Sequence, residues 1–344
     1  MKQNKFKFKT NFLKKIFIKF CRILGYEIID QNQFYVPTLN KSLSENLSVP
    51  GKKSIIVPTG EIKITRQVID FVILFRSCTK VNMLTQTKQR LFGKEKIEYT
   101  IRSLNSILKS LDVAKSNFPD INFKIIVIDY ASSHENKETL KKQISKCSVT
   151  SDFIELDINE FKNNINKKNA EGKSVTENQI SNMSNIHKSL LIAKSQCKDI
   201  VYFIEDDYIH EKDSITEMIY TYEKISSSVK KDIIICPSDY PYLYNKLEPA
   251  EIFLGHKKHW RRVRETLVSF LTSKKIVDFY WDKFVSMCKY EHYPFELPLH
   301  EIYKDEYCIS PMPSLAMHCT NINSIYGISP NFDWEKAWKD SKNY

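Results

Sequence analysis

The chain has 344 residues, of which 42% are hydrophobic and 27% are charged, a balance typical of a globular protein with a sizeable core. Its formal net charge of +11 lies mostly at one end, because residues 1–26 hold eight Lys or Arg residues and no acid. The rest of the chain carries 44 basic and 41 acidic residues, so its composition argues against a nucleic-acid-binding body.

The cysteine and glycine patterns exclude several further classes of protein. Eight cysteines are scattered without a C-x-x-C pair, and several lie in apolar runs, which predicts reduced thiols and a cytoplasmic protein. Seven glycines are too dispersed for the G-x-G-x-x-G or P-loop phosphate motifs. No stretch approaches the roughly 20 apolar residues of a membrane span, and basic residues interrupt the N-terminal apolar stretch, which disfavours a cleaved signal peptide.

The first predicted element is a basic amphipathic helix within residues 1–26. Its basic residues share one helical face, and the other face holds Phe12, Leu13, Ile16, Phe17, Phe20, Ile23 and Leu24. Such a helix either lies on an anionic membrane surface or docks on the body of the protein, and the sequence leaves both alternatives open. Residues 27–65 predict an irregular linker, so we expect 1–65 to precede a main domain at 66–344.

The main domain is predicted to begin as a βαβ unit. The predicted strands are 68–75, 123–128, 200–204 and 233–236, and the predicted helices are 97–111 and 186–193. Between them, the polar segment 134–180 predicts a partly mobile region with a weak strand signal at 153–156. This alternation of strands and helices predicts an α/β layered domain with a mostly parallel sheet.

The chain is organised around strand 200–204, which ends in Glu205, Asp206 and Asp207. Ligands bind outside the carboxyl ends of strands in open α/β sheets, and adjacent carboxylates repel one another unless a cation compensates them. The acids could instead cap the next helix, but Ser214 and Glu217 form a capping-box pattern that would serve this purpose. We therefore expect a metal or ligand site here, and oxygen ligands suit Mg²⁺ or Mn²⁺.

An extended backbone would point Glu205 and Asp207 to one side and Asp206 to the other. The first two acids would then face a metal, and the middle acid would face another part of the ligand. Further candidates follow in chain order. Asp129 ends strand 123–128, Asp305 and Glu306 lie in a charged stretch, and His318 ends P-S-L-A-M-H.

In this order and spacing the chain resembles inverting GT-A glycosyltransferases, specifically bacterial family-2-like enzymes, over roughly residues 66–340. V-I-D-Y-A-S-S is similar to their first nucleotide-binding strand end, I-E-D-D to their D-x-D motif, and D-E at 305–306 to their distal catalytic acid motif. The resemblance implies a GT-A-like Rossmann-type layered domain. Its nucleotide-sugar half would lie at about 66–210 and its acceptor half at about 211–344.

The resemblance also implies roles for individual residues. Asp305 and Glu306 would be catalytic acids, and Glu205, Asp207 and His318 would be metal ligands. The expected substrate-binding residues are Arg76, Asp129, Asp206, Asp239, Trp260 and Arg261. Alternatives remain open from the residues alone: Asp129 could start a turn, Asp239 is a rival base, and His318 could be a core histidine.

These observations predict a metal-dependent glycosyltransferase using Mn²⁺ or Mg²⁺, a UDP-linked sugar donor and a glycan or glycolipid acceptor, in surface polysaccharide synthesis. A divalent ion would neutralise the leaving diphosphate, and a base would accept the proton of the acceptor hydroxyl. We expect a cytoplasmic location, or the inner face of the cell membrane through residues 1–26. The alternatives are a nucleotidyltransferase, which usually needs the glycine-rich loop that is absent, and a non-enzymatic membrane- or nucleic-acid-binding adaptor.

Overall fold

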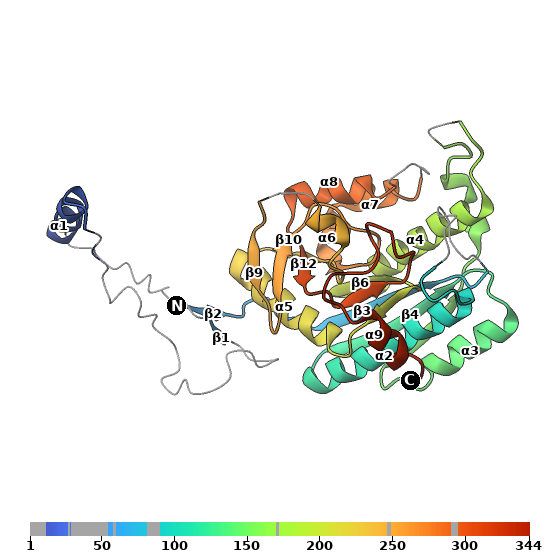
Figure 1. Cartoon of the computed structure of the whole chain (residues 1–344). Coiled ribbons are helices and arrows are strands. Elements are labelled where there is room, and N and C mark those ends of the chain that lie inside the picture. The colour runs from blue at the N-terminus through green and yellow to red at the C-terminus, as the bar shows by residue number, and fades with distance from the viewer. Residues whose placement is uncertain are drawn as a thin grey trace.

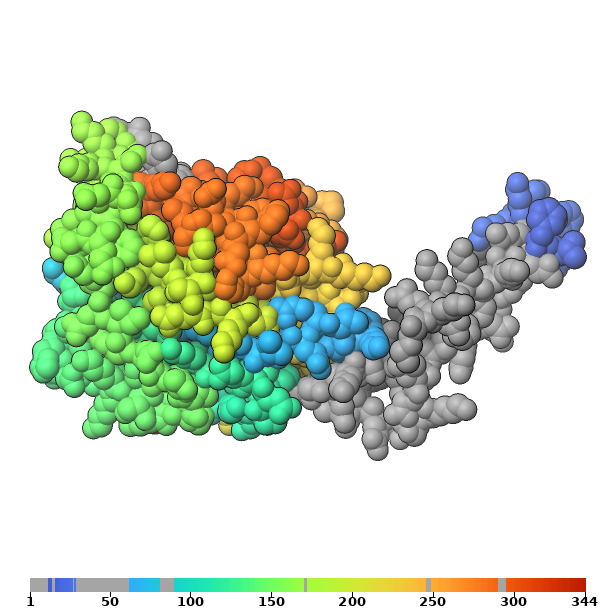
Figure 2. All heavy atoms as spheres, turned by 180° about the vertical axis from the view of Figure 1, so that it is seen from behind, coloured from blue at the N-terminus to red at the C-terminus, as the bar shows by residue number. Residues whose placement is uncertain are grey.

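The computed structural model describes residues 12–26, 28, 54–57, 60–80, 90–169, 172–245, 249–289 and 295–344. A large mixed α/β body follows an N-terminal segment (Figures 1 and 2). Among the described residues, no helix is long and apolar enough to cross a membrane.

A nine-stranded sheet in the order β5-β4-β3-β6-β11-β8-β12-β10-β9 forms the centre of the body (Figure 1). Its strands are β3 (Asp70–Ser77), β4 (Asn122–Asp129), β5 (Thr150–Glu155), β6 (Ile200–Glu205), β8 (Ile234–Ile235), β9 (Ile252–Leu254), β10 (His259–Arg262), β11 (Phe270–Ser273) and β12 (Cys308–Met312). In this described sheet, only β10 and β11 run opposite to the other strands. The predicted fold class, an α/β layered domain with a mostly parallel sheet, is confirmed.

Helices cover both faces of the sheet. One face packs against α2 (Lys96–Asn117), α3 (His134–Ile144) and α5 (Ser214–Val229), and the other against α4 (Glu177–Gln196), α6 (Lys274–Phe279), α7 (Trp281–Ser286) and α8 (Leu297–Asp305). Alternate residues of β3 enter the two cores, with Ile73 on the first face and Leu74 on the second. Burial on both faces explains why this strand is an unbroken apolar run.

The polar segment 134–180 contains more regular structure than its sequence predicted. It includes α3, strand β5, two short 3-10 helices (Ile158–Glu160 and Lys162–Asn164) and the start of α4. Helix α3 buries only Leu140 and Ile144, so its apolar stripe is too narrow to stand out in the sequence. Its start is fixed by Ser133, whose side chain accepts a hydrogen bond from the Asn136 amide.

The N-terminal segment also differs from its prediction. Helix α1 (Phe12–Ile23) forms where an amphipathic helix was expected, and its apolar side chains are exposed, with Phe12 at 73%. The predicted irregular linker includes an antiparallel hairpin of β1 (Ser54–Val57) and β2 (Gly60–Lys63). Most of the linker, like residues 1–11, lies outside the described residues.

The predicted capping box at the start of α5 is wrong. The N-cap residue is Asp213, whose side chain makes no capping hydrogen bond, and the Ile215 amide in the first turn donates instead to the Ser110 hydroxyl at 2.9 Å. Glu217 instead accepts hydrogen bonds from the backbone amides of His256, Lys257 and Lys258. This buried carboxylate therefore holds a loop before β10 against α5, a role that depends on residues about 40 positions away.

The parallel strands all end along one border of the sheet, which we call the carboxyl edge, and all begin along the opposite border, which we call the amino edge. The carboxyl edge is where β3, β4 and β6 end, at Ser77, Asp129 and Glu205. The amino edge is where the same strands begin. A small sheet of β7 (Tyr208–His210) and β13 (Ala316–His318) directly follows the acids, and α9 (Trp334–Asp340) packs beside it.

A buried acid on α5 gives a stability prediction. Burial raises the pKa of Glu223 from 4.5 to about 7, although its carboxylate accepts a hydrogen bond of 2.8 Å from the Val68 amide. The folded state thus binds a proton that the unfolded state releases between these pH values, so stability falls as pH rises from 4.5 to 7. We expect Glu223→Gln to stabilise the protein by at most about 3 kcal/mol above pH 7 and to have little effect near pH 4.5. Urea unfolding at the two pH values measures this; an equal gain at both would contradict it.

Candidate functional site

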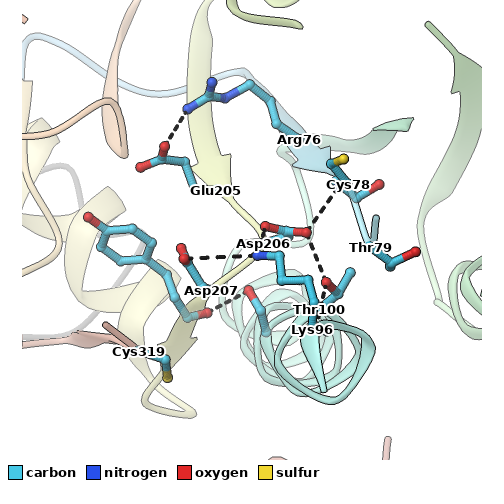
Figure 3. Close-up of polar contacts among 12 residues, drawn as sticks. Arg76, Cys78, Thr79, Lys96, Thr100, Glu205, Asp206, Asp207 and Cys319 are labelled. Atoms are coloured by element: carbon cyan, nitrogen blue, oxygen red, sulfur yellow. Dashed lines mark hydrogen bonds and ion pairs between the residues drawn. The ribbon is translucent and has the colours of Figure 1, made fainter. Parts of the chain in front are cut away.

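The three adjacent acids lie at the carboxyl edge, as the sequence predicted, and each pairs with a basic side chain of this chain. Glu205 pairs with Arg76 at 3.1 Å and Asp206 with Lys96 at 2.5 Å (Figure 3). Asp207 pairs with Arg90 at 2.7 Å. The bases come from the end of β3, the loop before α2 and the first residue of α2. The three carboxylates are therefore balanced by three cations of the protein itself.

Asp206 has both carboxylate oxygens engaged. Lys96 bonds to Oδ1, and the Thr100 hydroxyl and the Cys78 amide donate to Oδ2 at 2.8 and 3.1 Å (Figure 3). The extended alternation expected of the acids does not hold, because β6 ends at Glu205 and Lys96 lies within ion-pair distance of both Asp206 and Asp207. Asp206 thus ties β6 to β3 and α2, and its direct contact with a substrate stays a prediction.

Asp207 lies beside His318. Pairing of β13 with β7 sets His318 opposite Tyr208, and the imidazole Nε2 lies 3.6 Å from Asp207 Oδ1. The imidazole Nδ1 is 2.9 Å from the Tyr326 carbonyl oxygen, so it carries the hydrogen and donates it there. The His318 ring also stacks on Tyr208, with ring centroids 4.6 Å apart. These contacts fix the direction of Nε2.

Electrostatics favour the charged forms of this pair. Burial acts to raise the pKa of the Asp207 carboxyl, but the charges of Lys96, His318 and Arg90 hold that pKa well below its ordinary value. Burial likewise acts to lower the pKa of His318, and Asp207 outweighs it, so the pKa of His318 is raised. A carboxylate that stays ionised is available to bind a cation.

A divalent ion fits only part of the predicted ligand set. In the described part of the chain, no group of three or more His, Cys, Asp or Glu residues is arranged to hold a metal ion. Asp207 and His318 face each other, whereas Glu205 turns to Arg76. Mg²⁺ and Mn²⁺ sites often use one or two protein ligands with phosphate oxygens and water, so Asp207 and His318 suit such a site.

Asp129 also reaches the carboxyl edge. It is 1% exposed and accepts hydrogen bonds from the hydroxyls of Ser77 and Ser132 at 2.8 and 2.6 Å. Burial raises the pKa of Asp129, and these hydroxyls act against the rise. The carboxyl thus organises the ends of β3 and β4, and its predicted contact with a nucleotide base stays a prediction.

Asp239 and Arg261 form a second group at the same edge, after β8. The fully buried Asp239 carboxylate pairs with Arg261 and accepts a hydrogen bond of 2.5 Å from the Tyr244 hydroxyl. The Arg261 guanidinium lies over the Tyr244 ring, 4.4 Å from its centroid. Both oxygens of the Asp239 carboxylate are thus engaged within the protein, and the predicted substrate-binding roles of Asp239 and Arg261 stay predictions.

The predicted substrate-binding role of Trp260 is contradicted by its burial. Its side chain is 0% exposed, and its Nε1 donates a hydrogen bond of 3.2 Å to Glu217. A Cβ on Gly255 would lie 2.3 Å from the same Nε1, so the indole is packed directly against the backbone. Trp260 is a core residue that locks β10 to α5.

We expect Trp260→Phe to lower stability by about 1–3 kcal/mol, because Glu217 loses a hydrogen bond and the smaller ring leaves a void. The KM for any substrate should stay unchanged in the folded fraction. Chemical unfolding and initial-rate kinetics measure the two effects. An increased KM with unchanged stability would restore Trp260 to the substrate site.

Asp305 and Glu306 lie away from the other acids. Strand register through β11 and β8 puts Tyr202 and Ile309 at the same level of the sheet. Glu205 lies three residues after Tyr202, whereas Glu306 lies three residues before Ile309. At about 3.3 Å per residue the two acids are about 20 Å apart along the strands. The predicted catalytic pair is therefore at the amino edge, outside the group of residues around Asp207.

The other end of the same helix supplies an acid that sequence reasoning missed. Glu296 directly precedes α8, is 6% exposed, and its charge interacts with those of Glu205, Arg76 and His318. Burial raises the pKa of Glu296 to about 7. The only signal in the sequence was an acid before the L-P-L helix start, because Pro is favoured in a first helical turn.

No family model and no curated protein matches the chain. Similar solved structures include S. aureus TarS, which is 11% identical over 62% of this chain and 30% of the TarS chain, with a TM-score of 0.35. The galactosyltransferase LgtC in complex with donor and acceptor sugar analogs is 11% identical over 79% of this chain and 95% of its own, with a TM-score of 0.38. A UDP-glucose pyrophosphorylase complexed with UDP-glucose is 8% identical over 80% and 97%, with a TM-score of 0.38.

The aligned part of this chain thus spans under a third of TarS, at 30%. Because these TM-scores and identities are low, the similarities carry no argument about the chemistry of this chain. What the site can do has to follow from its own residues.

Proposed function

We propose that this chain is a metal-dependent glycosyltransferase that moves a sugar from a nucleotide-sugar donor to a hydroxyl of a glycan or glycolipid, with inversion. One observation carries the proposal. The ionised carboxylate of Asp207 and the directed Nε2 of His318 face each other at the carboxyl edge, at 3.6 Å, among three cations. That combination suits a diphosphate leaving group with a divalent ion.

Charge balance supports the need for an added cation. The three acids and their three basic partners compensate one another. A bound diphosphate would bring uncompensated negative charge into this partly buried site, where charges are poorly screened. Mn²⁺ or Mg²⁺ held by Asp207 and by His318, which would release its Nε2 proton on binding, would supply part of the missing positive charge and stabilise the leaving diphosphate.

Residues of the chain could hold the donor directly. Arg90 and Lys96 both lie beside Asp207. Their positive charges would therefore also be available to the oxygens of a diphosphate bound next to Asp207. The Nε of the buried Arg76 has no hydrogen-bond partner within the described residues, which leaves a donor for an anionic ligand. Asp129 and the ends of β3 and β4 would border the nucleotide.

Glu296 is the proposed base. A base that accepts a proton from an acceptor hydroxyl works best with a pKa near the working pH, and the pKa of Glu296 is about 7. The charges of Glu205, Arg76 and His318 act on the pKa of Glu296, which puts this carboxyl within electrostatic range of the proposed donor site. Neither Asp239, which is held by Arg261 and Tyr244, nor Glu306 at the amino edge meets both conditions.

The donor nucleotide, acceptor and location extend this proposal. A UDP-linked donor, an inverting family-2-like mechanism and a role in surface polysaccharide synthesis are proposed on the resemblance of the motifs. Helix α1 exposes apolar side chains such as Phe17 at 58% and Ile23 at 76%, and its neighbouring residues are basic. Action at the inner face of the cell membrane is therefore part of the proposal.

The test is thermal stability against nucleoside diphosphates and nucleotide sugars, each with Mn²⁺, with Mg²⁺ and without a divalent ion. A ligand that binds only the folded state raises Tm with its occupancy. We expect a metal-dependent rise with one class of nucleotide sugar. Products then decide the reaction: with an acceptor, release of the nucleoside diphosphate supports sugar transfer, whereas with added pyrophosphate, formation of a nucleoside triphosphate and a sugar 1-phosphate indicates the nucleotidyltransferase alternative. No Tm rise with any nucleotide would reject both enzymes and favour the adaptor.

A further inference from the structure

A large cavity lies at the amino edge, where the parallel strands begin, whereas the proposed active site lies where they end. Its volume is about 910 Å³. It is lined by the residues just before β3, β6 and β8 and by the end of the antiparallel strand β11 and the start of α6. Figure 2 views this side, where the blue segment leading to β3 lies next to the orange segment of α6. We call this space the amino-edge cavity.

The lining of the amino-edge cavity is strongly basic. Six Lys or Arg residues and three Asp residues line it. Since the chain outside residues 1–26 is nearly neutral, such an excess in one concave surface is a local feature. A concave surface with like charges focuses the electrostatic potential and attracts anions.

The carboxylates of the cavity are already used by an internal network. Arg66 pairs with Asp199 and, at 2.8 Å, with Asp232, and the Tyr222 hydroxyl donates to Asp232 at 2.8 Å. Asp278 pairs with Lys274 one turn earlier on α6. This network neutralises the three carboxylates, so none of them is left to pair with the other lysines of the lining.

Three lysines of the lining remain uncompensated. Within the described residues, Lys198, Lys230 and Lys231 make no ion pair with a carboxylate, and all three are exposed. The lining also includes the buried Ser226, whose hydroxyl has no hydrogen-bond partner among the described residues. Ammonium groups and a hydroxyl donor around one space are what a phosphate group requires.

We propose that the amino-edge cavity binds a ligand that carries two or more phosphate charges, held by Lys198, Lys230 and Lys231. A volume of about 910 Å³ accommodates an oligophosphate or a phosphorylated headgroup. Either a soluble oligophosphate or a lipid headgroup could supply this chemistry. The site is about 20 Å from the carboxyl edge along the strands and does not depend on the proposed transferase activity.

Lys230 offers a substitution that should not disturb folding. It follows α5 in the left-handed conformation, with φ 58°, where glycine is the favoured residue. Lys230→Gly should therefore leave Tm unchanged or higher while removing one cation from the cavity. We expect tripolyphosphate to bind the variant about fivefold more weakly, the effect of one partly exposed charge contact.

The main experiment is isothermal titration calorimetry of the full chain with tripolyphosphate in a metal-free buffer. The double variant Lys198→Glu/Lys231→Glu should bind at least about tenfold more weakly than the wild type. Lys142→Glu/Lys212→Glu is the matched control, because it makes the same change in net charge on exposed lysines outside the cavity. The control should weaken binding less than about twofold at physiological salt, where distant charges are screened.

A second arm identifies the source of the phosphate. Co-sedimentation compares the same proteins on phosphatidylcholine vesicles with and without phosphatidylglycerol. Weaker tripolyphosphate binding with unchanged vesicle binding supports a soluble ligand, and weaker binding to the anionic vesicles supports a lipid headgroup. If the cavity variants match the control in both assays, the proposal is overturned. The Tm rise with a nucleotide sugar should survive in every cavity variant, so this result is independent of the transferase test.

Discussion

Asp207→Asn is expected to lower kcat/KM by about 10²–10³, the size of effect seen when one group that stabilises transition-state charge is removed. The amide keeps the shape of the side chain but loses the charge that faces Arg90, Lys96 and His318. It should also abolish the difference in Tm between nucleotide sugar with and without Mn²⁺. Initial rates, scaled to the folded fraction, measure the first effect, and thermal unfolding measures the second.

Loss of stability must be separated from loss of chemistry in this variant. Breaking a buried ion pair costs about 3–5 kcal/mol, so Asp207→Asn will also unfold more easily. Asp232→Asn is the matched control, because Asp232 pairs with Arg66 at 2.8 Å but lies at the amino edge. The control should lose stability and keep its activity. Equal activity losses in the two variants would remove Asp207 from the proposed site.

Glu296→Gln is expected to lower kcat by about 10²–10⁴, the usual contribution of a general base, while the KM for the donor stays nearly unchanged. Because the pKa of Glu296 is about 7, wild-type activity should rise as the pH increases through that value, when the carboxyl loses its proton. The variant should lack this rise. A pH profile of kcat/KM from 5 to about 9 shows both results.

The Glu296→Gln substitution should raise the free energy of unfolding above pH 7 although it lowers activity. The raised pKa of Glu296 means that the folded state is penalised above pH 7, when this buried carboxyl ionises, so glutamine should stabilise the protein there. Glu223→Gln is the matched control, since the pKa of Glu223 is also about 7 but its side chain bonds to the Val68 amide before β3. Both variants should gain stability, and only Glu296→Gln should lose activity. A fully active Glu296→Gln enzyme would refute the assignment of the base.

Local patterns in the sequence predicted the framework of the sheet. The apolar runs before Ser77, Asp129 and Glu205 gave three adjacent parallel strands, because burial on both faces leaves an unbroken apolar signal. The same patterns predicted that Asp129 and the three acids would share the carboxyl edge. They did not reveal α3, whose narrow apolar stripe resembles a polar loop.

Errors arose where a residue's role depends on distant partners. Ser214 and Glu217 have the spacing of a capping box, yet Glu217 binds the amides of residues 256–258. Trp260 lies beside arginines in the sequence, yet the alternation of β10 turns it into the core. The Asp305–Glu306 pair lies at the end of a helix that runs between the two edges. Its position along the chain therefore does not show at which edge of the sheet it lies.

By itself, the sequence determined the central strands β3, β4 and β6, the helices α2 and α4 and the acidic strand end, since these follow from hydrophobic periodicity over a few neighbouring residues. Only the tertiary structure decided which charges meet. Arg76, Arg90 and Lys96 reach the acids from more than 100 positions away, pairing of β7 with β13 sets His318 beside Asp207, and the direction of α8 brings Glu296 rather than Asp305 to the carboxyl edge. Ion pairs and side-chain contacts of this kind depend on how the elements pack, and no local period in the sequence encodes that packing.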